Sequence, residues 1–169
     1  MYATPLCRTA AYSGCEATCS SATALEGLAW DGAQDVVPSE YEDEVVQLLE
    51  HCPEAVGLAR QTARVALRSW QMSAATTDMS LLVVSELVTN AVEHAKPPLA
   101  MHVGHQREPE QLWVGVTDGG PARQPGEWTS SCSRDEHGRG LHIVGSVSDA
   151  HGVTFHEVGI TRWARLAAR

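Results

Sequence analysis

Residues 85–95 read Ser-Glu-Leu-Val-Thr-Asn-Ala-Val-Glu-His-Ala, and they decide how the rest of the sequence is interpreted. Their apolar residues recur at helical spacing, and the pattern extends back to Thr77, whose hydroxyl can cap a helix that Pro97 ends. Glu86 and Asn90 are four residues apart, so they share one face of this helix. Isolated Glu and Asn side chains on helices usually face solvent. The pair therefore indicates a binding site only if other polar elements converge on it.

A second amphipathic helix is predicted before this one. Apolar residues recur at helical spacing from Val56 to Trp70, and Pro53 stands where the helix is entered. The apolar run Val45–Leu49, ahead of that proline, is expected to form an edge strand. An arginine row at four-residue intervals lines another face of the helix, and it is either a solvated face or a surface for a partner protein. The row consists of Arg60, Arg64 and Arg68.

The second half of the sequence contains strands, one irregular segment and one short helix. Two runs of alternating apolar residues, Ala100–His105 and Leu112–Thr117, predict an antiparallel hairpin. Residues 119–138 are rich in Gly, Pro, Ser and charge, which is typical of a functional lid. A short helix over 141–147 and a closing hairpin around Gly159 follow. We therefore expect an α+β two-layer sandwich, in which a mixed, mostly antiparallel sheet packs on helices.

The composition favours one cytoplasmic domain with an N-terminal arm. Residues 1–40 lack sustained periodicity and are expected to be flexible, whereas residues 41–169 form the domain. The net charge of -9 argues against nucleic-acid binding, since phosphate contacts need a basic surface. Neither a membrane helix nor a signal peptide is predicted, so no membrane association is expected. The 5 cysteines form no Cys-x-x-Cys pair, and His102 and His105 point to opposite faces of a strand, so these residues predict no metal site.

Two further polar elements are expected to lie near the Glu86–Asn90 pair. Asp118-Gly119-Gly120 ends a predicted strand, and Gly138-Arg139-Gly140 opens a predicted helix after the lid. Glycines at a helix N-terminus expose backbone N–H groups that bind phosphate well. The three elements together predict one cleft.

Four segments in this order and spacing resemble the motifs of the histidine-kinase-like (GHKL) ATPases, which have the Bergerat ATP-binding fold. The group most similar to this sequence is that of the bacterial anti-sigma-factor serine/threonine kinases, of the actinobacterial type. The resemblance implies binding of ATP and Mg²⁺. The segments are Ser85–Ala95 for the N box, Val116–Gly120 and Gly138–Val144 for the two glycine boxes, and Gly159–Leu166 for the final strand with its threonine.

Each matched residue has a role that the resemblance implies and that its chemistry allows. Asn90 would hold the magnesium ion through its amide oxygen, and Glu86 would accept a proton from an attacking hydroxyl. Asp118 would accept a hydrogen bond from the adenine amino group, whereas the carbonyl of guanine would face it unfavourably. Thr161 would support the adenine end. The remaining nucleotide contacts would come from Gly120, Gly138, Arg139, Gly140 and Leu141, although Arg139 is equally suited to an outward salt bridge.

Other nucleotide-binding classes fit less well. A P-loop needs a lysine after glycine, but the single lysine, Lys96, follows the predicted helix. A dinucleotide fold is not expected, since no strand precedes Gly138. A sensor kinase is not expected either, because no dimerisation helix or membrane segment is predicted. One departure from the family pattern is Ala122, where sensor kinases carry a further glycine.

Two functional classes remain open. The first is a kinase that phosphorylates an anti-anti-sigma (STAS-type) protein and sequesters a sigma factor. The second is a non-catalytic switch that binds a regulator according to its nucleotide state. Glu86 favours the kinase, whereas the unusual lid and the long arm are compatible with the switch. A homodimer is possible in either case.

Overall fold

The computed structural model describes residues 36–122, 139–157 and 159–168, which all lie in the compact unit Asp31–Arg169. The expected arm therefore falls outside the described residues, except for residues 36–40. None of the helices in the described segments is long and apolar enough to cross a membrane. The elements are β1 (Asp43–Leu49), α1 (Ala55–Ser69), α2 (Ala74–His94), β2 (Leu99–Arg107), β3 (Glu110–Asp118), α3 (Arg139–Val147), β4 (Ala150–His156) and β5 (Gly159–Ala167).

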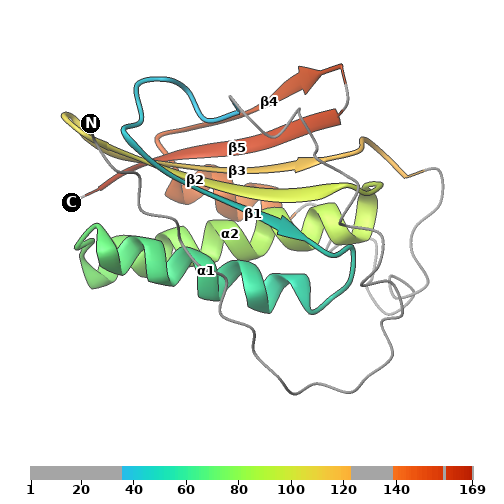
Figure 1. Ribbon diagram of the computed structural model, residues 1–169, viewed down its shortest axis with the longest axis horizontal. Coiled ribbons are helices and arrows are strands. Elements are labelled where there is room, and N and C mark those ends of the chain that lie inside the picture. Colours follow the sequence, from blue (N-terminus) through green and yellow to red (C-terminus); the bar gives the residue numbers. More distant parts are fainter. Residues whose placement is uncertain (1–35, 123–138, 158, 169) are drawn as a thin grey trace, which may run out of the picture. The chain divides into compact units, whose positions relative to one another are not determined.

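The strands form one sheet in the order β1-β2-β3-β5-β4, and the helices lie on one side of it (Figure 1). This confirms the predicted α+β two-layer sandwich. The expectation of a mixed sheet is refined, because all four strand pairings in the described residues are antiparallel. β1 pairs with β2 alone, so it is an edge strand as predicted. β5 follows β4 in the sequence but lies between β3 and β4 in the sheet.

The β2–β3 hairpin is longer than its apolar pattern predicts. Gln106 pairs with Gln111 and Arg107 pairs with Glu110, so only Glu108 and Pro109 remain in the turn. The polar segment 106–111 separates the two predicted strands. It continues the strands instead, because backbone hydrogen bonds form between strands whatever the polarity of exposed side chains.

Helix α2 begins three residues before the predicted cap. The N-cap is Ser73, whose hydroxyl accepts a hydrogen bond from the backbone N–H of Thr76 at 3.1 Å. Thr77 is therefore inside the first turn, and its prediction as the cap was wrong. The two alanines between Ser73 and Thr76 are good helix formers, which allows the helix to start earlier.

The arginine row on α1 is not uniformly solvated. Arg60 is half-buried and donates a hydrogen bond to the hydroxyl of Ser85 at 2.5 Å, which joins α1 to α2. Arg68, at the other end of the helix, is exposed. The first residue of the row is therefore part of the contact between the helices.

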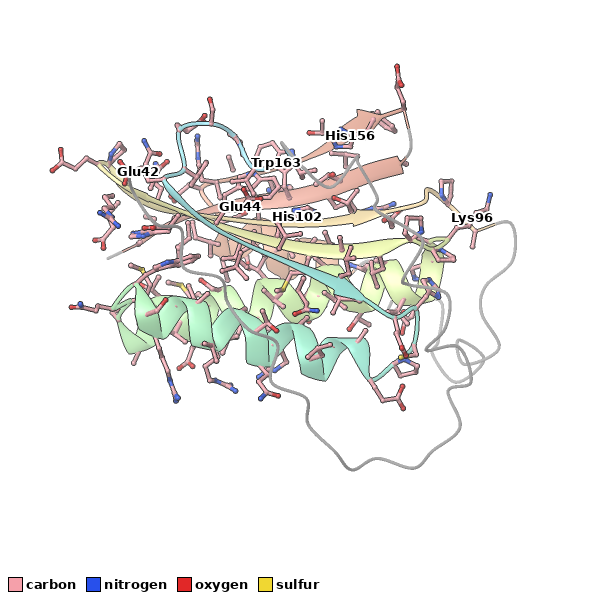
Figure 2. The ribbon with its side chains drawn as sticks, in the orientation of Figure 1. Glu42, Glu44, Lys96, His102, His156 and Trp163 are labelled. Carbon is pink, nitrogen blue, oxygen red and sulfur yellow. The ribbon has the colours of Figure 1, made fainter. Side chains whose placement is uncertain are left out.

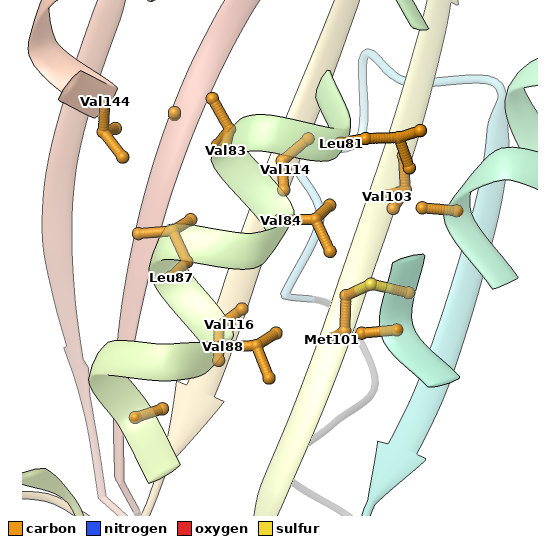
Figure 3. Packing of buried hydrophobic residues seen from close by; sticks show 14 of the residues in the cluster. Leu81, Val83, Val84, Leu87, Val88, Met101, Val103, Val114, Val116 and Val144 are labelled. Atoms are coloured by element: carbon orange, nitrogen blue, oxygen red, sulfur yellow. The ribbon is translucent and has the colours of Figure 1, made fainter. Parts of the chain in front are cut away.

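The core lies between the helices and the sheet (Figure 3). Alternate residues of β2 and β3, including Met101, Val103, Val114 and Val116, face α2. Burial of each such side chain contributes about 1.5–3 kcal/mol relative to exposure. The facing residues are Leu81, Val83, Val84, Leu87 and Val88 of α2, together with Val144 of α3.

A smaller cluster covers the opposite face of the sheet. Val37 and Tyr41 precede β1 and pack with Trp113 of β3 and the half-buried Trp163 of β5. Residues 36–40, which were assigned to the arm, therefore belong to the packed domain. We call these four residues the outer-face cluster.

A row of hydrogen bonds follows the same outer face of the sheet. The Nε2 of His102 is 3.1 Å from the Oγ1 of Thr117, and Thr117 is 2.8 Å from the Oγ1 of Thr161. Thr161 is in turn 2.8 Å from the Nε2 of His156. Figure 2 labels both histidines of the row, His102 and His156.

The two histidines of β2 lie on opposite faces, as predicted from their spacing. His105 stacks on Trp70 at the end of α1, with 5.3 Å between the ring centroids, whereas His102 meets Trp113 of the outer-face cluster edge-on.

Candidate nucleotide-binding site

Glu86 and Asn90 lie in the second half of α2, on neighbouring turns of one face. Both residues are half-buried, while Leu87 and Val88 between them are buried in the core. The Nδ2 atom of Asn90 is buried and has no hydrogen-bond partner among the described residues. A buried amide group without a partner costs free energy, so it is expected where a ligand completes the hydrogen bonding.

Asp118 is the last residue of β3, and its side chain is 0% exposed. Asp118 is two residues after Val116 and four after Val114, so all three side chains lie on the face of the sheet that the helices cover. Its Oδ1 accepts a hydrogen bond from the backbone N–H of Gly120 at 2.8 Å. Burial raises the pKa of this carboxyl group, and the charge of Arg162 opposes that rise.

Backbone hydrogen bonds join the turn after Asp118 to the end of α2. The N–H of Gly119 donates to the carbonyl of Lys96, and the N–H of Lys96 donates to the carbonyl of Gly120, each at 2.8 Å. The N–H of Ala122 donates to the carbonyl of His94 at 2.9 Å. We call these three bonds the α2–β3 clasp; Lys96 is labelled in Figure 2. The clasp holds the buried carboxylate against the end of the helix that carries Glu86 and Asn90.

The turn contains glycine at two positions, 119 and 120, for different structural reasons. A Cβ atom at Gly119 would collide with the backbone carbonyl of Pro97, so the close approach in the clasp requires glycine. Gly120 has a φ of 84°, which side-chain-bearing residues rarely adopt, and the nearest atom to a Cβ there would be 3.9 Å away. Glycine is therefore favoured at position 120 by the backbone conformation, and at position 119 by the close backbone contact.

Arg162 is a further charged residue at this site, and it was not predicted from the sequence. This residue of β5 is paired with Val116, and its Nη1 forms an ion pair with the Oδ2 of Asp118. The sequence signal that could have identified Arg162 is the alternation along β5, because Arg162 shares a strand face with the buried residues Ala164 and Leu166. An arginine on an otherwise apolar strand face indicates a buried acidic partner.

Thr161 lies on the other face of β5. Its hydroxyl belongs to the row with Thr117 and His156 on the outer face of the sheet, whereas Asp118 faces the helices. The β5 residue that pairs with Asp118 is Ile160. The backbone around Thr161 is thus next to Asp118, but the structure does not bring the two side chains together.

The second glycine box is described only in part. Gly138 lies outside the described residues. Arg139, Gly140 and Leu141 form the first turn of α3, so a helix begins there as predicted. Their side chains are not among those the structure describes. Helix α3 packs in the same core as α2 through Val144.

The described residues fit a nucleotide with its magnesium ion. The side-chain oxygen of Asn90 is the kind of ligand that magnesium prefers. The buried Nδ2 of Asn90, which has no partner among the described residues, is a donor suited to a phosphate or water oxygen. In the described segments no group of three or more His, Cys, Asp or Glu side chains is placed to hold a metal ion. An ion at Asn90 would therefore take most of its ligands from phosphate oxygens and water, which is usual for magnesium.

Residues 49–162 match the family model of the histidine kinase-like ATPase domain. The chain belongs to the histidine kinase-like ATPase family. This confirms the family resemblance found in the four motifs. Membership of this ATPase family implies ATP binding, and the matched range includes Glu86, Asn90, Asp118 and Arg162.

The fold is similar to that of the RsbU and RsbW domains of Rv1364c from Mycobacterium tuberculosis, seen in a crystal structure. The TM-score is 0.58 at 16% identity, and the similarity covers 75% of this chain and 32% of that chain. At this identity the similarity shows a shared histidine kinase-like ATPase fold and no more. No curated protein sequence matches the chain.

Proposed function

We propose that the chain is a regulatory serine/threonine kinase that transfers the γ-phosphoryl group of ATP to an anti-anti-sigma (STAS-type) protein and sequesters a sigma factor. The observation that supports it best is the α2–β3 clasp, which holds buried Asp118 next to the end of the helix carrying Glu86 and Asn90. Family membership supports the nucleotide, and the resemblance of the motifs to anti-sigma-factor kinases suggests the partners.

The proposed mechanism assigns one task to each side chain. Magnesium–ATP, when bound, supplies the phosphoryl group. Asp118 accepts a hydrogen bond from the adenine amino group, and Asn90 holds the ion through its amide oxygen. Glu86, one turn before Asn90, accepts the proton of the attacking serine or threonine hydroxyl. Positioning and charge neutralisation provide most of the catalysis in phosphoryl transfer, so these residues act mainly by placing the reactants.

The two α2 residues should fail differently when substituted. Asn90→Ala removes an ion ligand, so both ATP affinity and phosphoryl transfer should fall, and excess magnesium should restore binding only in part. Glu86→Gln should bind ATP normally while transfer drops by roughly 10²–10⁴-fold, as expected for a lost general base. ATP affinity is measured by calorimetry, and transfer by labelling of a serine-bearing partner with radioactive ATP.

Asp78→Asn is the matched control, since Asp78 is an exposed acidic residue near the other end of α2. It should change neither quantity. Full transfer by Glu86→Gln would show that Glu86 is not the base. If the wild type binds ATP but labels no protein in an extract of its own organism, the non-catalytic switch is the better description.

A further inference from the structure

The ion pair between Arg162 and Asp118 crosses from β5 to β3 beneath the helices. The Arg162 side chain is 26% exposed, whereas that of Asp118 is 0% exposed. The Nη1 of Arg162 contacts Oδ2, and the N–H of Gly120 occupies Oδ1. The carboxylate is therefore held from two sides, by one charged and one neutral donor.

Holding this carboxylate has an energetic reason. An ionised carboxyl group buried without a partner is strongly disfavoured, and it takes up a proton instead. Burial raises the pKa of Asp118, while the charge and hydrogen bond of Arg162 oppose the rise. A carboxylate has about four acceptor positions, so about two remain available after the hydrogen bonds from Gly120 and Arg162 are formed. Asp118 can thus still accept a hydrogen bond from a ligand.

We propose that Arg162 is a positioning residue for base recognition, which keeps Asp118 ionised and oriented so that it accepts a hydrogen bond from the adenine amino group. The inference rests on the proposed ATP binding at this site. Without Arg162, burial acts on Asp118 with less opposition and favours its protonated form, and the hydroxyl that results is a donor where the base needs an acceptor. Arg162 acts through Asp118 and does not take part in phosphoryl transfer.

The test compares ATP affinity of Arg162→Met and Arg162→Lys with the wild type, by calorimetry between pH 6 and pH 8.5. At each pH the variant affinity is divided by the wild-type affinity, so the effect of titration of the ATP phosphates, which is the same for both proteins, cancels. For Arg162→Met this ratio should be about 0.1 or lower at pH 6, as for one lost charge-assisted hydrogen bond, and should be higher at pH 8.5, because a higher pH favours the ionised form of Asp118. Arg162→Lys keeps the charge and should restore most of the affinity.

Other charged groups near this end of the fold are the same in every variant, so they do not affect the ratio. His51, between β1 and α1, also acts on Asp118 through its charge. Other titratable residues on the elements of the site are Glu86, Glu93 and His94 of α2, Lys96 after it, and His142 of α3. Arg165→Met is the matched control, because Arg165 lies on β5 but faces the opposite side of the sheet. It should leave the ATP affinity unchanged at every pH.

Three results would overturn the inference. A ratio of one for Arg162→Met at every pH would mean that the ion pair serves stability alone. Tighter ATP binding by Arg162→Met would mean that the guanidinium obstructs the base. If the wild type itself bound no ATP, the proposed function would fail together with the inference. If circular dichroism shows that Arg162→Met is unfolded, the ATP affinities of Arg162→Gln and Arg162→Lys are compared instead.

Discussion

At the residue scale, Asp118 accepts donors from two directions, the backbone of Gly120 and the guanidinium of Arg162. Its remaining acceptor positions are directed by these two contacts, since a carboxylate that is held on both oxygens has little rotational freedom. Adenine presents an amino group to such an acceptor, whereas guanine presents a carbonyl at the same position. The identity of the base should therefore depend on this one side chain.

Asp118→Asn should weaken ATP binding roughly 10- to 100-fold, because a charge-assisted hydrogen bond of about 1.5–3 kcal/mol is lost. The wild type should prefer ATP to GTP. Calorimetry with both nucleotides checks this, and Asp149→Asn, an exposed acidic residue before β4, serves as the control. Equal affinities of the wild type for ATP and GTP would contradict the assignment of Asp118 as the base reader.

A second buried titratable residue, His102, lies on the outer face. It is 0% exposed, and burial lowers the pKa of His102 to about 4, with a smaller effect from the charge of His156. Glu44 is the nearest acidic group, 4.0 Å from its Nδ1. In the unfolded chain the same histidine titrates near its ordinary pKa of 6.5.

The fold should therefore lose stability as the pH falls from about 6.5 to about 4, since in that window the unfolded chain binds a proton that the folded chain does not. The contribution of His102 is fully present above pH 6.5. At pH 4.5 it should be reduced by about 2–3 kcal/mol, and His102→Gln should lack this part of the pH dependence. Urea unfolding at pH 7.5 and 4.5 measures it, with the exposed His142→Gln as control. An unchanged pH dependence in His102→Gln would contradict the prediction.

At the scale of elements, residues 36–42 form a short segment that packs on the sheet before β1 begins. Val37 and Tyr41 are both buried in the outer-face cluster against Trp113. The N–H of Glu42 also donates to the carbonyl of His105 at 3.0 Å, next to the first β1 pair. The segment is thus bound to the sheet by both packing and a backbone hydrogen bond.

Removal of residues 1–35 should leave the free energy of unfolding nearly unchanged, since their composition offers too little patterned apolar surface to offset ordering. Removal of residues 1–41 should destabilise the domain, and Tyr41→Ala alone should cost about 3 kcal/mol. Urea unfolding compares these variants, with the exposed Glu40→Ala as control. If both truncations were equally stable, the outer-face cluster would contribute nothing to the fold.

At the scale of the whole molecule, the elements could be predicted because their signals are local. The periodicity of α1 and α2 and the alternation in β2 and β3 are properties of single segments, as are the motif positions of Glu86, Asn90 and Asp118. Their membership of one family was predictable for the same reason, since the motifs are short and ordered.

Contacts between segments could not be predicted in this way. The ion pair of Arg162 with Asp118 and the separation of Thr161 from it depend on the register between β3 and β5. The packing of Val37 and Tyr41 depends on Trp113, which is far along the chain. The cap at Ser73 was missed because the hydroxyls of Ser73 and of Thr77, four residues later, can each cap a helix, and the backbone geometry decides between them.

The position of β5 has a consequence for synthesis of the protein. Among the described strands, β3 gains its second neighbour from β5, which follows it by about 40 residues. This edge of β3 therefore lacks its partner while residues 119–158 are translated. An unpaired strand edge with apolar residues is prone to wrong pairing. The β1–β2–β3 sheet on its two helices is complete before then, but Asp118 lacks its ion pair with Arg162 until β5 is made. The nascent chain should thus become competent to bind nucleotide only after translation has passed β5.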